Sequence, residues 1–128
     1  MIFVDTNYFL RLILQDNDLH HQEAKKLFQD GARGKVKLFT SLIVIFEIYW
    51  VLSSFYQREK KEIGRVLQNI LKMDFVGFEQ KEYLHKALSI YCKSSLDLED
   101  SYNLAYAKGN KAKDYKTFDK KLARRFEK

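Results

Sequence analysis

The chain opens with the segment MIFVDTN, residues 1–7, and this segment decides the class of fold. Residues 2–4 form an apolar run rich in β-formers, long enough for a buried strand and too short for a helix. Asp5 follows at once, and a helical pattern begins over residues 8–14. Open α/β sheets place their ligand chemistry at the C-terminal ends of such strands, which is where Asp5 falls. A plainer interpretation stays open, in which one of the polar residues 5–7 only caps the helix.

The size and composition of the chain favour one compact domain without covalent cross-links. Its 128 residues, of which 46% are hydrophobic, are enough to bury a core. Cys92 is the only cysteine, which excludes an internal disulfide and a zinc cluster built on thiolates. This cysteine content fits a reducing cytoplasm. We expect no signal peptide, because no basic segment precedes a long apolar stretch and Asp5 interrupts the first apolar run. We also expect no membrane span, because the longest apolar run, residues 42–52, is short and contains Glu47.

Positive charge is concentrated in residues 108–128. This segment holds nine Lys or Arg residues and three acidic residues, which accounts for the whole net charge of +6. A basic segment on an otherwise neutral chain favours a polyanionic partner such as RNA or DNA. The alternative is a solvated helix that carries many lysines without binding anything.

Strand patterns alternate with helix patterns along the whole sequence. The expected strands lie at residues 2–4, 36–39, 75–78 and the more polar 115–118. The expected helices lie at residues 8–14, 20–30, 42–56, 60–72, 80–93, 98–108 and 119–127. Asn17 or Asp18 is the expected N-cap of the second helix, and Thr40 or Ser41 that of the third. The alternation predicts an α/β fold with a mainly parallel sheet.

Glu47 lies in the most apolar part of the sequence. Its neighbours over residues 42–52 are all apolar, so a helix there should be buried around most of its circumference. Burying an unpaired carboxylate costs several kcal/mol, so such a group needs a cation or hydrogen-bond donors. The next basic residue downstream is Arg58, more than two helical turns away. The sequence therefore leaves two explanations, an ion pair from another helix or a bound metal ion.

Further acids lie at helix starts. Asp97 and Asp100 belong to the segment SSLDLED at residues 94–100, and Asp119 follows the segment KTF. Each could serve only as a helix cap or as a favourable charge at a helix N-terminus. Several carboxylates at one edge of a sheet repel one another and favour a cation. An all-oxygen set, without paired His or Cys, points to Mg²⁺ or Mn²⁺ rather than zinc. The acids expected to share this edge are Asp5, Glu47, Asp100 and Asp119.

These motifs, in this order, resemble those of PIN-domain nucleases, and most closely the toxin ribonucleases of VapBC-type toxin–antitoxin modules. The matching segments are VDTN at 4–7, Thr40-Ser41 followed by Glu47, LED at 98–100 leading into NLAYA, and TFD at 117–119. The resemblance covers the whole chain, residues 1–128, as a single PIN-like nuclease domain. It implies a three-layer fold, with a central parallel sheet, helices on both faces and an acidic pocket for one or two Mg²⁺ or Mn²⁺ ions.

The resemblance also assigns roles to individual residues. It implies that Asp5, Glu47, Asp100 and Asp119 are catalytic metal ligands, oriented by Asn7 and Thr117. It further implies an RNA substrate, a protein antitoxin and a homodimer. Two departures stand out: Ser101 replaces the alanine that commonly follows the third acid, and the polar segment 113–116 replaces an apolar strand.

The leading interpretation is therefore a metal-dependent endoribonuclease. The basic residues expected to hold the RNA backbone are Lys116, Lys120, Lys121, Arg124 and Arg125. The rival interpretation is a catalytically inactive PIN-like protein that binds RNA or acts as a scaffold. Asp97 is left between two roles, a helix cap and a supporting residue of the site. His20, His21 and His85 share no metal-ligand spacing and are expected to be solvated.

Overall fold

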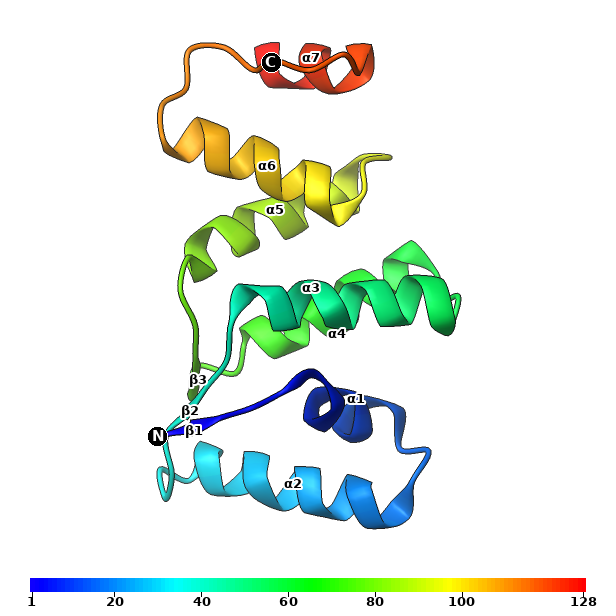
Figure 1. Cartoon of the computed structure of the whole chain (residues 1–128), viewed down its shortest axis with the longest axis vertical. Coiled ribbons are helices and arrows are strands. Elements are labelled where there is room, and N and C mark those ends of the chain that lie inside the picture. Colours follow the sequence, from blue (N-terminus) through cyan, green and yellow to red (C-terminus); the bar gives the residue numbers. More distant parts are fainter. The chain divides into compact units, whose positions relative to one another are not determined.

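A computed structural model describes all 128 residues, which divide into two compact units, residues 1–79 and 80–128. Figure 1 shows the elements of both units in chain order by colour. The first contains β1 (Ile2–Phe3), α1 (Thr6–Leu14), α2 (Asp18–Ala32), β2 (Leu38–Phe39), α3 (Leu42–Trp50), the π-helix η1 (Val51–Phe55), α4 (Lys60–Leu71) and β3 (Val76–Gly77). The second contains α5 (Lys81–Lys93), α6 (Leu98–Gly109) and α7 (Lys120–Glu127).

The three strands form one parallel sheet in the order β1-β2-β3. Leu38 is its centre, paired with Ile2 on one side and with Val76 on the other. The parallel pairing follows from the helical connections, because each strand is followed by helices that return the chain to the same end of the sheet. The predicted α/β class with a mainly parallel sheet is confirmed.

The first strand is less buried than its sequence predicts. Ile2 and Phe3 are 40% and 49% exposed, and only Val4, just after the strand, is fully buried. The reason is that β1 is an edge strand, paired on one side only. Phe3 keeps one apolar partner, since its ring packs edge-on against that of Phe39 at a centroid distance of 5.3 Å.

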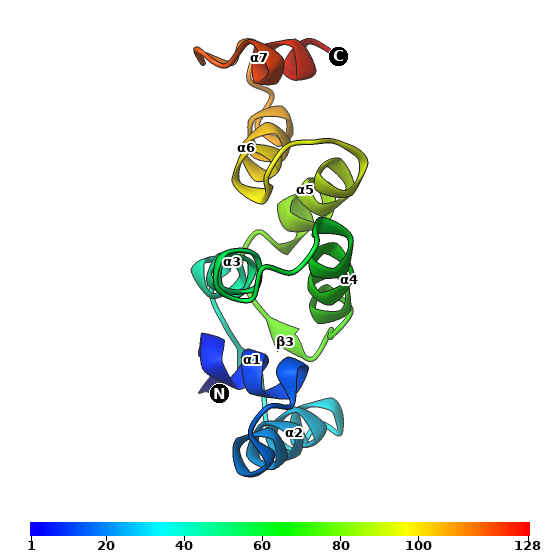
Figure 2. The same cartoon turned by 90° about the vertical axis from the view of Figure 1, so that its right-hand side faces the viewer.

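Helices pack in pairs around the sheet of the first unit. α1 packs on α2, and α3 packs on α4, as Figure 2 shows from the side. Gly31 lets α2 approach the central strand, because a Cβ at this position would lie 2.6 Å from the Leu38 side chain. The largest fully buried side chains of this unit are Val4, Phe9, Ile45, Ile48, Leu52, Ile63, Leu67 and Val76.

The helix that carries Glu47 changes its winding near its end. The sequence predicts one helix that ends near Tyr56, and the chain is helical over that range. Its last five residues, 51–55, are wound as a π-helix, and the Tyr56 N–H donates to the Val51 carbonyl at 3.0 Å. Such wider turns are rare, and they recur at functional sites.

The second unit is built from helices alone. α5 and α6 pack against each other, and α7 closes the unit through a small apolar cluster. Leu122 of α7 is buried there with Leu96 and Leu104. Gly109 keeps the end of α6 close to α5, since a Cβ there would lie 2.3 Å from the Tyr83 ring.

The expected strand at residues 115–118 is wrong. The segment is a loop without strand pairing. Its side chains explain why: Lys116 forms a 2.8 Å ion pair with Asp114, and Phe118 is fully exposed. Only Tyr115 packs inward, with its ring 5.5 Å from that of Phe126.

No helix in the structure is both long and apolar enough to cross a membrane.

Candidate active site

Asp5 and Glu47 are joined through Thr6. Oδ1 of Asp5 caps α1 by accepting a 2.8 Å hydrogen bond from the Thr6 backbone N–H. The Thr6 hydroxyl donates to Oε1 of Glu47 over 3.2 Å. Thr6 therefore links two acids that are far apart in sequence, and the sequence motifs alone did not single it out.

The expected burial of Glu47 is wrong. Its side chain is exposed, although its neighbours Phe46 and Ile48 are buried. The helix buries one face only, and Glu47 lies on the other face with Ile43 and Trp50, which are 57% and 38% exposed. These positions are spaced by three or four residues and so share one side of a helix. An exposed carboxylate does not need an ion pair or a metal ion to offset the cost of burial.

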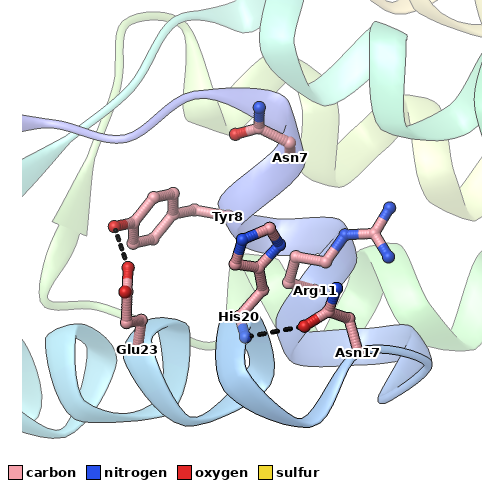
Figure 3. A pocket seen from close by; sticks show the side chains of 6 residues that line it. All are labelled: Asn7, Tyr8, Arg11, Asn17, His20 and Glu23. Carbon is pink, nitrogen blue, oxygen red and sulfur yellow. Dashed lines mark hydrogen bonds between the residues drawn. The ribbon is translucent and has the colours of Figure 1, made fainter.

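Asn7 opens onto a pocket on the surface of the first unit. The pocket has a volume of about 490 Å³ and is lined by Asn7, Tyr8, Arg11, Asn17, His20 and Glu23. One side is closed by Tyr8, whose hydroxyl donates to a carboxylate oxygen of Glu23 at 3.3 Å (Figure 3). The pocket thus offers an aromatic ring, a cation and several hydrogen-bonding groups close in sequence to Asp5.

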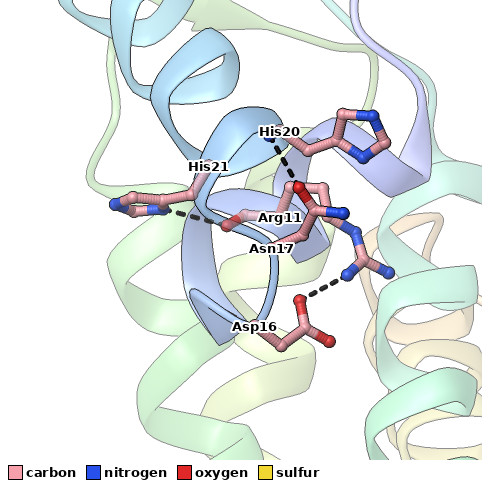
Figure 4. Close-up of polar contacts among 5 residues, drawn as sticks. All are labelled: Arg11, Asp16, Asn17, His20 and His21. Atoms are coloured by element: carbon pink, nitrogen blue, oxygen red, sulfur yellow. Dashed lines mark hydrogen bonds and ion pairs between the residues drawn. The ribbon is translucent and has the colours of Figure 1, made fainter.

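A polar network holds the residues around this pocket in place (Figure 4). Arg11 is paired with Asp16, and the Asn17 side chain caps α2 by accepting from the His20 N–H at 3.0 Å. The Arg11 carbonyl accepts from Nδ1 of His21, 3.0 Å away. His20 is exposed, as expected. His21 is half-buried, which corrects its expected solvation.

Asp97 is the N-cap of α6, one of the two roles that its sequence position allows. Its Oδ1 accepts a 2.8 Å hydrogen bond from the Asp100 N–H, and its carbonyl accepts from the Ser101 hydroxyl at 2.7 Å. Ser101 is fully buried. The serine that departs from the family pattern thus ties the first turn of α6 to its own cap.

Asp100 is half-buried and lies near other acidic side chains. Partial burial raises its pKa above the usual value, and the negative charges of Asp97, Asp119 and Glu99 raise it further. The same charge acts on Tyr115, whose pKa is raised by burial first and by Asp100 second. Residues 80–128 therefore bring several carboxylates close enough to repel one another.

Asp119 is held by two local hydrogen bonds. Its Oδ1 caps α7 by accepting from the Leu122 N–H at 3.1 Å, and its own N–H donates to the Thr117 hydroxyl at 3.1 Å. Thr117 thereby fixes the backbone just before the helix. This arrangement keeps Asp119 in place although no strand precedes it.

The basic residues expected to bind RNA fall into two groups. Lys116 is paired with Asp114, and this hydrogen bond raises the pKa of the lysine. The others belong to α7, where Lys121, Arg124 and Arg125 line a pocket that Lys120 does not reach.

Each unit holds two of the four candidate metal ligands, Asp5 and Glu47 in the first and Asp100 and Asp119 in the second. No three His, Cys, Asp or Glu side chains within either unit form a group that could hold a metal ion by themselves. The donor atoms are all carboxylate oxygens, the ligand type that suits Mg²⁺ or Mn²⁺. The pKa of Asp100 is raised first by burial and then by the neighbouring negative charges, and a nearby cation would offset only the effect of those charges.

Comparison with known proteins decides the family. The model of the PIN domain family matches residues 2–127, almost the entire chain. The chain belongs to the PIN domain family. It is also similar to the VapC ribonuclease of Aquifex aeolicus (strain VF5), with 25% identity over 122 residues that cover 95% of this chain and 90% of the relative. No solved structure matches this PIN domain. The resemblance inferred from the sequence motifs is confirmed.

Proposed function

We propose that this PIN-domain protein is a metal-dependent endoribonuclease that acts as the toxin of a toxin–antitoxin pair. The name of its relative, a VapC ribonuclease, supports the activity and the substrate class. The observation that carries the proposal is the match of the PIN domain family over residues 2–127, a range that includes all four candidate acids. The negative charges of Asp97, Asp119 and Glu99 near Asp100 add support, because a divalent cation would offset them. All four candidate acids are exposed or half-buried and thus accessible to an ion.

The proposal assigns the ligand role to Asp5, Glu47, Asp100 and Asp119. When bound, Mg²⁺ or Mn²⁺ supplies an activated water and neutralises charge on the scissile phosphate. Around these ligands, Thr6 holds Glu47 by a hydrogen bond and Thr117 holds the backbone of Asp119. Asn7 lines the pocket and lies two residues after Asp5 in the sequence, so we assign it a role in contacting substrate. Asp97 acts as a cap that sets the first turn of α6.

The remaining parts of the proposal concern assembly and substrate binding. Basic residues of α7 hold the RNA backbone, since phosphate contacts supply most of the affinity for nucleic acid. A protein antitoxin covers the active site until it is removed. The proposed assembly is a homodimer. The proposed location is the cytoplasm, which is in keeping with the single exposed cysteine, Cys92.

The rival function is an inactive PIN-like RNA-binding or scaffold protein. It is favoured by one observation, the basic pocket of α7, which could bind RNA without any cleavage. The two functions differ in their need for the carboxylates. RNA binding alone requires none of them, whereas hydrolysis requires Asp100.

The test is cleavage of a labelled single-stranded RNA by the purified full chain. Cleavage should need Mg²⁺ or Mn²⁺, stop in excess EDTA and return when the metal is restored. Asp100→Asn should abolish cleavage while keeping the fold, and Asp97→Asn serves as the matched control because asparagine preserves the cap. Cleavage that continues in excess EDTA would rule out the metal mechanism. RNA binding without cleavage in the wild type would favour the scaffold function.

A further inference from the structure

A second pocket, with a volume of about 450 Å³, lies in the unit formed by residues 80–128. One wall is the connection between α5 and α6, and the other is α7. Its lining residues are Ser94, Ser95, Leu96, Lys121, Arg124, Arg125 and Lys128. The lining contains four cations and two hydroxyl groups, and it contains no acidic side chain. Such a composition selects for an anion.

The basic side of this pocket is formed by α7 and the residue that follows it. Lys121, Arg124 and Arg125 recur at helical spacing and share one face of α7, and Lys128 follows directly after the end of the helix. The opposite face carries Leu122 and Phe126, which pack on Leu96 and Leu104. The apolar cluster thus anchors α7 so that its basic face meets the α5–α6 connection. Like charges three or four residues apart on a helix repel one another, and a bound anion would relieve that repulsion.

The two serines complete the set of donors. The Lys121 amino group donates to the Ser95 hydroxyl, so the hydroxyl proton of Ser95 stays available to a ligand. The Ser94 hydroxyl accepts from the Leu96 N–H at 3.2 Å and can donate in the same way. Hydroxyl, ammonium and guanidinium groups together suit a phosphate, whose oxygens take several donors at once.

We propose that this pocket binds one phosphate group of the RNA backbone beside the scissile bond. The inference rests on the proposed nuclease function, and it names a phosphate subsite that includes Ser94, Ser95 and Lys128. RNA is favoured over an acidic peptide because the pocket shares its helix with Asp119. At 1.5 Å of rise per residue, Arg124 lies roughly 7.5 Å along the axis from Asp119, so a phosphate held there belongs to a nucleotide near the cleavage point.

The test is RNA binding measured by fluorescence anisotropy, with every protein carrying Asp100→Asn so that the labelled RNA stays intact. The pocket variant combines Lys121→Gln with Arg124→Gln. The matched control combines Lys86→Gln with Lys111→Gln, which removes two charges from exposed positions of the same unit that lie outside both α7 and the pocket. The pocket variant should bind at least about tenfold more weakly, and its log–log salt slope should fall by about 0.7 for the lost phosphate contact. The control should lose about threefold or less, through general charge alone.

A second variant distinguishes a loss of RNA binding from a loss of folding. Ser95→Ala keeps every charge, and it should weaken RNA binding measurably while its melting temperature stays at that of the parent. Equal losses in the pocket and control variants would overturn the subsite, because the effect would then belong to overall charge. The subsite would also be overturned if the pocket variant bound RNA normally but lost binding to a polyglutamate peptide.

Cleavage by the protein without Asp100→Asn separates this inference from the proposed function. Metal-dependent cleavage together with unchanged RNA binding by the pocket variant would overturn the subsite alone. Absence of cleavage together with a selective binding loss in the pocket variant would overturn the nuclease proposal and leave the phosphate pocket standing.

Discussion

The Thr6 hydroxyl donates a hydrogen bond to Oε1 of Glu47, with 3.2 Å between the two oxygens. Thr6 also donates its backbone N–H to Asp5, so one residue at the start of α1 contacts two of the proposed ligands. The contact connects the end of β1 to the middle of α3. It holds a carboxylate that is exposed to solvent.

Thr6→Val should reduce cleavage through this contact. Valine keeps the shape of threonine but removes the hydroxyl, so Glu47 loses its hydrogen-bond donor while the Asp5 cap remains. The loss of stability should be about 1 kcal/mol or less, because the bond is solvent-exposed. Thr6→Ser keeps a hydroxyl and should retain most activity. The measurement is the cleavage rate and melting temperature of both variants, and equal activity in the two would show that the hydroxyl has no role.

Glu47→Gln should abolish cleavage with little effect on folding. Because Glu47 is exposed, the substitution should change the free energy of unfolding by no more than about 0.5 kcal/mol. Chemical denaturation of the metal-free protein checks the stability, and RNA cleavage checks the role. A large loss of stability would show that Glu47 is paired with a cation in the folded protein.

Substitutions at Asp97 should separate capping from metal binding. Asp97→Ala removes the acceptor for the Asp100 N–H and should cost about 1 kcal/mol of stability. Asp97→Asn keeps an acceptor oxygen and should preserve both stability and most activity. Thermal unfolding and cleavage of the two variants, measured side by side, check this. An inactive Asp97→Asn with normal stability would instead place Asp97 among the ligands.

The raised pKa of Asp100 predicts how stability depends on pH. Because its folded pKa lies above the unfolded value of 3.8, the folded protein holds the proton more tightly. The stabilisation from that proton is complete below the unfolded pKa and is lost as the pH rises through the folded pKa. Asp100→Asn should therefore melt at a higher temperature than the wild type at neutral pH, and the difference should vanish below about pH 4. A lower melting temperature at neutral pH would contradict the repulsion among these acids.

Divalent metal should stabilise the protein. Mg²⁺ or Mn²⁺ that binds only the folded state at a hundred times its dissociation constant adds about 2.7 kcal/mol. The melting temperature should rise with either ion and return to its starting value with EDTA. The control is a buffer without divalent ions, brought to the same ionic strength with KCl, because screening alone would also reduce repulsion among the carboxylates.

Local features of the fold could be predicted because they depend on neighbouring residues. Asn17, Ser41 and Asp97 cap their helices as the sequence indicates, since a cap needs only a side-chain acceptor just before the helix. The strand expected at residues 115–118 was wrong because this polar segment forms the local Asp114–Lys116 ion pair and does not pair with another strand.

The candidate site was harder to predict where its contacts are distant in sequence. The burial of Glu47 was predicted wrongly because a run of apolar residues does not show which side of the helix faces solvent. Its exposed companions, Ile43 and Trp50, became visible only in the structure. Thr6 was overlooked because its partner is 41 positions away. The basic residues of α7 could be predicted as an RNA-binding group because positive charge is concentrated there. Ser94 and Ser95 line the same pocket, but they carry no charge and belong to no pattern that predicts RNA binding.

The register of the sheet has a consequence for the time course of folding. Leu38 must find both Ile2 and Val76, so each strand pairing closes a long stretch of chain. The helices of residues 80–128 instead pack against neighbours in sequence. Distant pairings form slowly and local ones quickly. After dilution from denaturant, helical signal from α5 and α6 should therefore appear before the sheet, and the contact between Thr6 and Glu47 should be among the last native contacts to form.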